Sequence, residues 1–153
     1  SDLILSLFPL FFLPSEEVIE NDMVNMSFAY INKIVNYLHK HRVSLLLTDM
    51  HSPNYEKMNF EEKVYFQYIT KTWWGGRLVD YRLYVNILKI FNENLRNYAE
   101  KNDVPLVSIS DVFSKESPSV FNDICHMKLV GIKLKAEAIG NFIREKNLID
   151  CNK

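Results

Sequence analysis

The strongest constraint on the fold is the alternation of short apolar runs with long amphipathic segments. The apolar runs have the length of strands and cover residues 3–8, 43–48 and 104–109. Apolar side chains at helical spacing predict helices over residues 23–42, 61–72, 81–101 and 128–146. In the first helix the expected buried face carries Met23, Met26, Tyr30, Ile34, Val35 and Leu38. Such an alternation predicts an α/β fold, with a parallel sheet and helices on both of its faces.

The predicted sheet is small, because sheets usually have about four to six strands. The chain also opens on Ser1 rather than Met and reaches apolar residues almost at once. We therefore expect residues 1–153 to form a single domain that is partial and lacks the first strands of its sheet. The uncovered edge of the strand at 3–8 then predicts self-association or pairing with another chain.

Charge and composition exclude several classes of partner. Lys and Arg number 18 and Asp and Glu 19, so the net charge of −1 gives no bulk attraction to nucleic acid or an anionic membrane. The apolar segment 3–13 is too short to span a bilayer, and Pro9 interrupts it. We therefore expect no nucleic-acid partner and no membrane span.

Cysteine and histidine are too few for a Cys-type zinc cluster, and we expect neither a metal nor a cofactor. The two cysteines, Cys125 and Cys151, bracket the last predicted helix. A helix of that length would separate them by roughly 30 Å, which is beyond the reach of a disulfide. We therefore expect free thiols, which indicate no particular cellular compartment.

The best local signal for chemistry is a D-x-x-H segment before the last predicted helix. Asp123 lies three residues before His126, and Gly131 lies five residues after it. Asp123 is expected to bind one ring nitrogen and to leave the other as a general base toward a hydroxyl nucleophile. The structural alternative is an aspartate that caps the helix beside a half-buried histidine. Cys125 is not expected to turn toward the adjacent ring.

This segment, with its glycine and C-terminal amphipathic helix, resembles the last conserved block of the SGNH (GDSL-type) hydrolases. The order of the predicted elements is also similar to that family, from about Leu3 to Ile143. The resemblance implies a three-layer α/β/α, flavodoxin-like fold and an acyl- or acetylesterase acting on a small-molecule or glycan ester. It assigns His126 as the base that activates a serine and Asp123 as the partner of His126.

The nucleophile half of that family's site has no match. There is no G-D-S segment, and residues 8–11 stand where a G-x-N-D segment is expected. Asn21 and Asp22 are interpreted as a helix cap, because Ile19 replaces the glycine. The serine of the triad is therefore expected to lie outside this chain. Two alternatives remain: an inactive relative that binds a carbohydrate or a protein partner, and a receiver-like domain with Asp49 as phosphoacceptor.

Five further residues are candidates for a substrate pocket. They are Asp49, His51, Ser52, Trp73 and Trp74. The first three follow the second predicted strand, at the sheet edge where α/β proteins place their sites. The two tryptophans offer a flat apolar platform for an acyl or sugar group. The structural alternatives are a turn held by side-chain hydrogen bonds and the packing of a helix that ends at Gly75.

Overall fold

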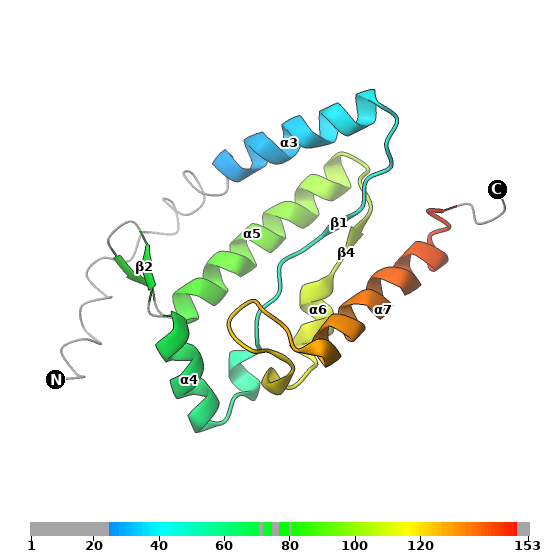
Figure 1. Cartoon of the computed structure of the whole chain (residues 1–153). Coiled ribbons are helices and arrows are strands. Elements are labelled where there is room, and N and C mark those ends of the chain that lie inside the picture. The colour runs from blue at the N-terminus through cyan, green and yellow to red at the C-terminus, as the bar shows by residue number, and fades with distance from the viewer. Residues whose placement is uncertain (1–24, 71, 75–76, 80, 150–153) are drawn as a thin grey trace.

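The chain is a mixed α/β protein that is mostly helical (Figure 1). The computed structural model describes residues 25–70, 72–74, 77–79 and 81–149, with the backbone alone for 72–79. The predicted strand at 3–8 and the predicted cap at 21–22 lie outside these residues. The elements are α3 (Asn25–Lys40), β1 (Leu47–Thr48), the 3₁₀ helix η3 (Tyr55–Lys57), α4 (Phe60–Thr70), β2 (Thr72–Trp74), β3 (Arg77–Val79), α5 (Tyr81–Lys101), β4 (Leu106–Val107), α6 (Ile109–Ser114), the 3₁₀ helix η4 (Pro118–Val120) and α7 (Leu129–Glu145).

The central feature is a parallel pair of short strands, β1 and β4. Leu47 lies opposite Leu106 and Thr48 opposite Val107, which confirms a parallel pairing. In Figure 1 the pair lies between α5 and α7. Burial of residues 43–48 on both faces is a wrong prediction, because β1 is only half-buried and Val43 is exposed. Within the described residues β1 has β4 as its one paired neighbour.

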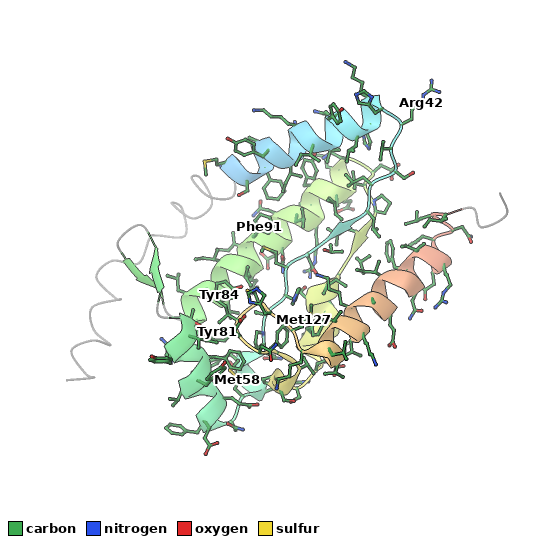
Figure 2. All side chains as sticks on the ribbon, in the orientation of Figure 1. Arg42, Met58, Tyr81, Tyr84, Phe91 and Met127 are labelled. Carbon is green, nitrogen blue, oxygen red and sulfur yellow. The ribbon has the colours of Figure 1, made fainter. Side chains whose placement is uncertain are left out.

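The core lies where α4, α5 and α6 meet. Tyr81, Ile109 and Phe113 are almost completely buried there, and Figure 2 shows Tyr81 at the start of α5. The Tyr81 hydroxyl donates a hydrogen bond to the Pro53 carbonyl, and burial raises its pKa well above the ordinary value. The predicted amphipathic helix over 81–101 is confirmed, because its apolar stripe supplies this core.

Helix α3 packs on α5 through a face that only partly matches the predicted one. The ring of Phe28 lies 5.6 Å from that of Phe91 and 5.5 Å from that of Tyr98. Val35 is buried and Leu38 half-buried, as predicted, whereas Met26, Tyr30 and Ile34 are exposed. The partners of Phe28 lie on α5, and the spacing of apolar residues within α3 does not reveal them. None of the described helices has the length and hydropathy needed to cross a membrane.

Two connecting segments also differ from the sequence-based expectation. The sequence of residues 110–122 predicts a loop with one short turn, whereas the structure has α6, which begins at Ile109, and η4 there. Trp73 and Trp74 lie in strand β2, which pairs antiparallel with β3, and not at the end of a helix. The glycines at 75 and 76 explain this difference, because Gly-Gly between two short apolar runs is typical of a β-hairpin.

Candidate active site

Asp123 and His126 lie in the loop that joins η4 to α7. The backbone closes this loop, since Phe121 and Met127 form an antiparallel bridge. The Asn122 N–H also donates a 2.8 Å hydrogen bond to the His126 carbonyl. The loop is therefore a compact unit whose backbone fixes the positions of both functional side chains.

The two side chains contact each other as the sequence predicts. His126 Nδ1 lies 2.8 Å from Oδ2 and 3.0 Å from Oδ1 of Asp123. A carboxylate in this position selects the tautomer that carries its proton on Nδ1. The His126 side chain is 76 % exposed, so Nε2 is left as the nitrogen available to a substrate or nucleophile.

Asp123 is held as an anion by the turn that it forms. The backbone N–H groups of Cys125 and His126 donate to Oδ1 at 3.0 and 2.8 Å. Burial alone would raise the pKa of Asp123, but these hydrogen bonds and the contact with His126 outweigh it and lower the pKa to about 2. The structural alternative is not what the chain adopts, because the N-cap of α7 is Lys128 and the His126 ring is exposed.

Gly131 allows the start of α7 to lie close against the loop. A Cβ at this position would come within 3.0 Å of both the Val120 carbonyl oxygen and Met127 Cβ. Contacts that close force the surroundings to move, so a side chain here would displace α7 from the loop. The glycine that follows the D-x-x-H segment thus has a packing role that bears on the position of His126.

Cys125 turns toward the ring of His126, which corrects the expectation from sequence. Its Sγ lies 3.6 Å from His126 Nδ1 and 3.6 Å from Asp123 Oδ1, because the turn around Asp123 brings the three side chains to one side. Cys125 is an exposed free thiol, as predicted, and Cys151 lies outside the described residues. Burial and then the nearby Asp123 carboxylate raise the pKa of the thiol.

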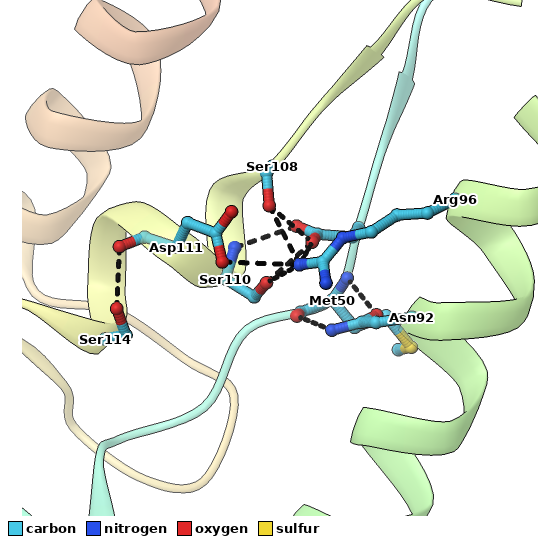
Figure 3. Close-up of polar contacts among 8 residues, drawn as sticks. Met50, Asn92, Arg96, Ser108, Ser110, Asp111 and Ser114 are labelled. Atoms are coloured by element: carbon cyan, nitrogen blue, oxygen red, sulfur yellow. Dashed lines mark hydrogen bonds and ion pairs between the residues drawn. The ribbon is translucent and has the colours of Figure 1, made fainter. Parts of the chain in front are cut away.

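Asp49 forms the centre of a second polar cluster, shown in Figure 3. Its carboxylate is fully buried and accepts hydrogen bonds from the Arg96 guanidinium at 2.8 Å and the Ser110 hydroxyl at 2.6 Å. The Ser110 N–H and the Ser108 hydroxyl donate at 2.8 and 3.1 Å. These bonds join the end of β1 to β4, α5 and α6. A carboxylate occupied in this way offers no exposed oxygen to a phosphoryl donor, so the geometry does not favour the receiver-like hypothesis.

Sequence reasoning did not single out Arg96 or its neighbour Asn92. The Asn92 side chain accepts from the Met50 N–H at 2.9 Å and donates to the Met50 carbonyl at 2.7 Å, so it holds the chain that follows β1 (Figure 3). A signal was present, because Asn92 stands four residues after Leu88 and three before Leu95 on the buried stripe of α5. A polar residue at a core-facing position usually has a specific hydrogen-bond partner.

A cavity of about 370 Å³ lies between residues 50–56, α5 and α6. Its walls include Ser52, Tyr55, Val85, Arg96 and Asp111. Of the predicted pocket residues Ser52 lines this cavity, whereas Asp49 and His51 do not. The side chains of Trp73 and Trp74 lie outside the described residues. Of Asp49, His51 and Ser52, Ser52 alone is therefore placed where it can contact a molecule in the cavity.

His51 is half-buried between aromatic rings, and neither of its buried ring nitrogens has a hydrogen-bond partner among the residues that the structure describes. Its ring lies 5.1 Å from that of Phe113 and 5.8 Å from that of Phe121. Burial, and then the positive charge of Lys135, lower the pKa of His51, and the opposing influences of the Cys125 backbone and Asp49 are smaller. The folded protein therefore disfavours protonation of His51.

This burial predicts a contribution to acid sensitivity. Below the ordinary histidine pKa of 6.5 the unfolded chain takes up a proton at His51 that the folded chain resists. The free energy of unfolding therefore falls as the pH drops from about 7 to about 5, by at most about 1.4 kcal/mol per pH unit for one proton. His51→Phe should show a smaller drop in urea denaturation, and His39→Phe, at an exposed position, the wild-type drop. An equal drop in both variants would contradict this.

Comparison of the chain with protein-family models, curated proteins and solved structures found no match. The function is therefore argued from the geometry of the site and from the sequence pattern that carries it.

Proposed function

We propose that this chain is a serine-type ester hydrolase, most simply an acyl- or acetylesterase, in which His126 is the general base and Asp123 orients it. The observation that carries the proposal is the 2.8 Å contact between His126 Nδ1 and the Asp123 carboxylate, on an otherwise exposed ring. The resemblance of the D-x-x-H segment to the last block of the SGNH (GDSL-type) hydrolases supports the same assignment.

The chemistry follows from which nitrogen the carboxylate binds. The Nδ1–H of His126 donates a hydrogen bond to Asp123 and keeps its proton, so Nε2 carries the lone pair. That lone pair accepts the proton of a serine hydroxyl as the serine oxygen attacks the acyl carbon. Asp123 stabilises the imidazolium formed in this step, which then returns the proton to the leaving alcohol. Water releases the acyl group by the same sequence. No hydrogen bond joins His126 to a serine among the described residues, and the proposal takes the serine to lie outside this chain, because the sequence has no G-D-S segment.

We also propose that the β1–β4 pair belongs to a three-layer α/β/α sheet of the flavodoxin-like type. The parallel register of the pair and the positions of α5 and α7 to either side of it in Figure 1 support this arrangement. In such sheets the loops that follow the carboxyl ends of the strands build the site. The polar residues after β1 and β4, which include Asp49 and Ser110, follow that pattern.

A direct test combines turnover with labelling of the nucleophile. Together with the segment that supplies the serine, the protein should hydrolyse p-nitrophenyl acetate, and a fluorophosphonate probe should label one serine and abolish that activity. Peptide mapping would then identify the serine. If the protein neither hydrolyses the ester nor reacts with the probe, the esterase proposal fails and the non-catalytic binding domain replaces it.

Asp123→Asn tests the role of the carboxylate without removing its turn. The amide oxygen can still accept the N–H groups of Cys125 and His126, but the amide N–H donates to Nδ1 and favours the tautomer with its proton on Nε2. We expect kcat to fall by roughly 10²-fold, less than for a fully buried aspartate because water reaches this site. Asp111→Asn is the control at an exposed aspartate. Activity of Asp123→Asn within twofold of wild type would contradict the assigned role.

A further inference from the structure

The turn around Asp123 brings three potential metal-ligating atoms, an oxygen, a sulfur and a nitrogen, close together. A carboxylate oxygen of Asp123, Sγ of Cys125 and Nδ1 of His126 all lie within 4.8 Å of one another. Counting cysteines and histidines does not reveal this cluster, because an aspartate completes it and because Cys125 is not expected to face the ring. The backbone hydrogen bonds to Asp123 fix the turn before any ligand arrives.

The spacing of these atoms matches a tetrahedral site for zinc. Bond lengths of about 2.3 Å to sulfur and about 2.0–2.1 Å to nitrogen or oxygen separate neighbouring ligand atoms by roughly 3.5 Å. Cys125 Sγ lies 3.6 Å from His126 Nδ1 and 3.6 Å from Asp123 Oδ1. The contacts of Nδ1 with the carboxylate are shorter, at 3.0 Å to Oδ1 and 2.8 Å to Oδ2, because the proton on Nδ1 is shared with Asp123, and they lengthen when a cation replaces that proton.

We propose that Asp123, Cys125 and His126 form a binding site for a borderline-soft divalent cation such as Zn²⁺. The thiolate and imidazole ligands favour Zn²⁺ over Mg²⁺ and Ca²⁺, which prefer oxygen. Three ligands leave the fourth tetrahedral position to water. On binding, the proton of the Cys125 thiol goes to solvent, and the His126 ring carries its proton on Nε2 instead of Nδ1.

This change of tautomer gives the site a regulatory consequence. With Nδ1 bound to the metal and Nε2 protonated, the ring has no lone pair to accept a proton from a nucleophile. Metal binding and general-base catalysis therefore exclude each other at His126. This consequence, inhibition by the cation, rests on the proposed esterase function, whereas the binding site does not.

Titration with Co²⁺ tests the site independently of catalysis. The whole chain should show a near-ultraviolet thiolate-to-cobalt charge-transfer band that saturates at one equivalent and disappears when Zn²⁺ is added. Cys151→Ser, the matched control at the other cysteine, should keep the band, and Cys125→Ser should lose it. Replacing the imidazole ligand in His126→Gln should weaken Co²⁺ affinity by at least about 10-fold.

The esterase assay supplies the second measurement. Zn²⁺ should inhibit wild type and Cys151→Ser, and should inhibit Cys125→Ser at least about 10-fold less effectively, each measured relative to that protein's own rate without metal. Circular dichroism confirms that the variants remain folded. The site is refuted if wild type shows no charge-transfer band, or if the band survives in Cys125→Ser. A band without ester hydrolysis by the metal-free protein would support the metal site and reject the proposed function.

Discussion

Replacing His126 with alanine is expected to lower kcat for p-nitrophenyl acetate by at least about 10³-fold, with little change in KM. The variant has no Nε2 to accept the serine proton and no imidazolium for Asp123 to stabilise. The stability of the protein should change little, because the His126 side chain is 76 % exposed and its backbone hydrogen bonds do not depend on the ring. Steady-state kinetics on purified protein measure this effect.

A matched control separates this effect from the general loss of a surface histidine. His39 is exposed in the last turn of α3, and His39→Ala should hydrolyse the ester within about twofold of wild type. Free imidazole added to His126→Ala should restore part of the activity, because it can enter the space left by the ring. A variant at position 126 that keeps wild-type kcat would exclude His126 as the base.

Replacing Asp49 with alanine is expected to destabilise the fold by about 3 kcal/mol. The change leaves the Arg96 guanidinium, the Ser110 N–H and two serine hydroxyls without their shared acceptor. We expect the lower end of the range for a broken buried ion pair, because the Arg96 side chain is 39 % exposed and water can solvate part of it. Urea denaturation followed by circular dichroism measures the loss.

Asp111→Ala is the control for that experiment. Asp111 also faces Arg96, at 3.4 Å, but its side chain is 69 % exposed. Exposed ion pairs contribute about 0–1 kcal/mol, so this variant should unfold near the wild-type midpoint. Equal destabilisation of the two variants would show that Asp49 is not the centre of the cluster.

The sequence predicts the Asp123–His126 contact because that contact is local. Two side chains three residues apart meet whenever the backbone turns between them, and the residue types identify the chemistry. It does not predict the cluster around Asp49, because its partner Arg96 is 47 residues away along the chain. Nor does it predict that Cys125 faces the ring, which depends on the backbone angles of one turn.

The same difference between local and distant contacts explains which parts of the fold the sequence predicts. Helical spacing predicts α5 and α7 well, because amphipathic periodicity is a property of each segment. Spacing alone does not say which stripe of α3 is buried, since the aromatic partners of Phe28 lie on α5. Gly75 and Gly76 are a local hairpin signal that outweighs the weaker helical pattern before them.

We expect contacts between residues close in sequence to form before contacts between residues far apart, and to break after them. The turn that joins Asp123 to His126 closes over three residues, so its entropic cost is small and it can form early or persist in a partly unfolded chain. The bond between Ser110 and Asp49 spans 61 residues, and the parallel pairs Leu47–Leu106 and Thr48–Val107 span 59 each. We therefore expect that junction to form after the turn, because closing a long loop costs more entropy. The proposed proton acceptor can therefore outlast the scaffold that presents it to a substrate.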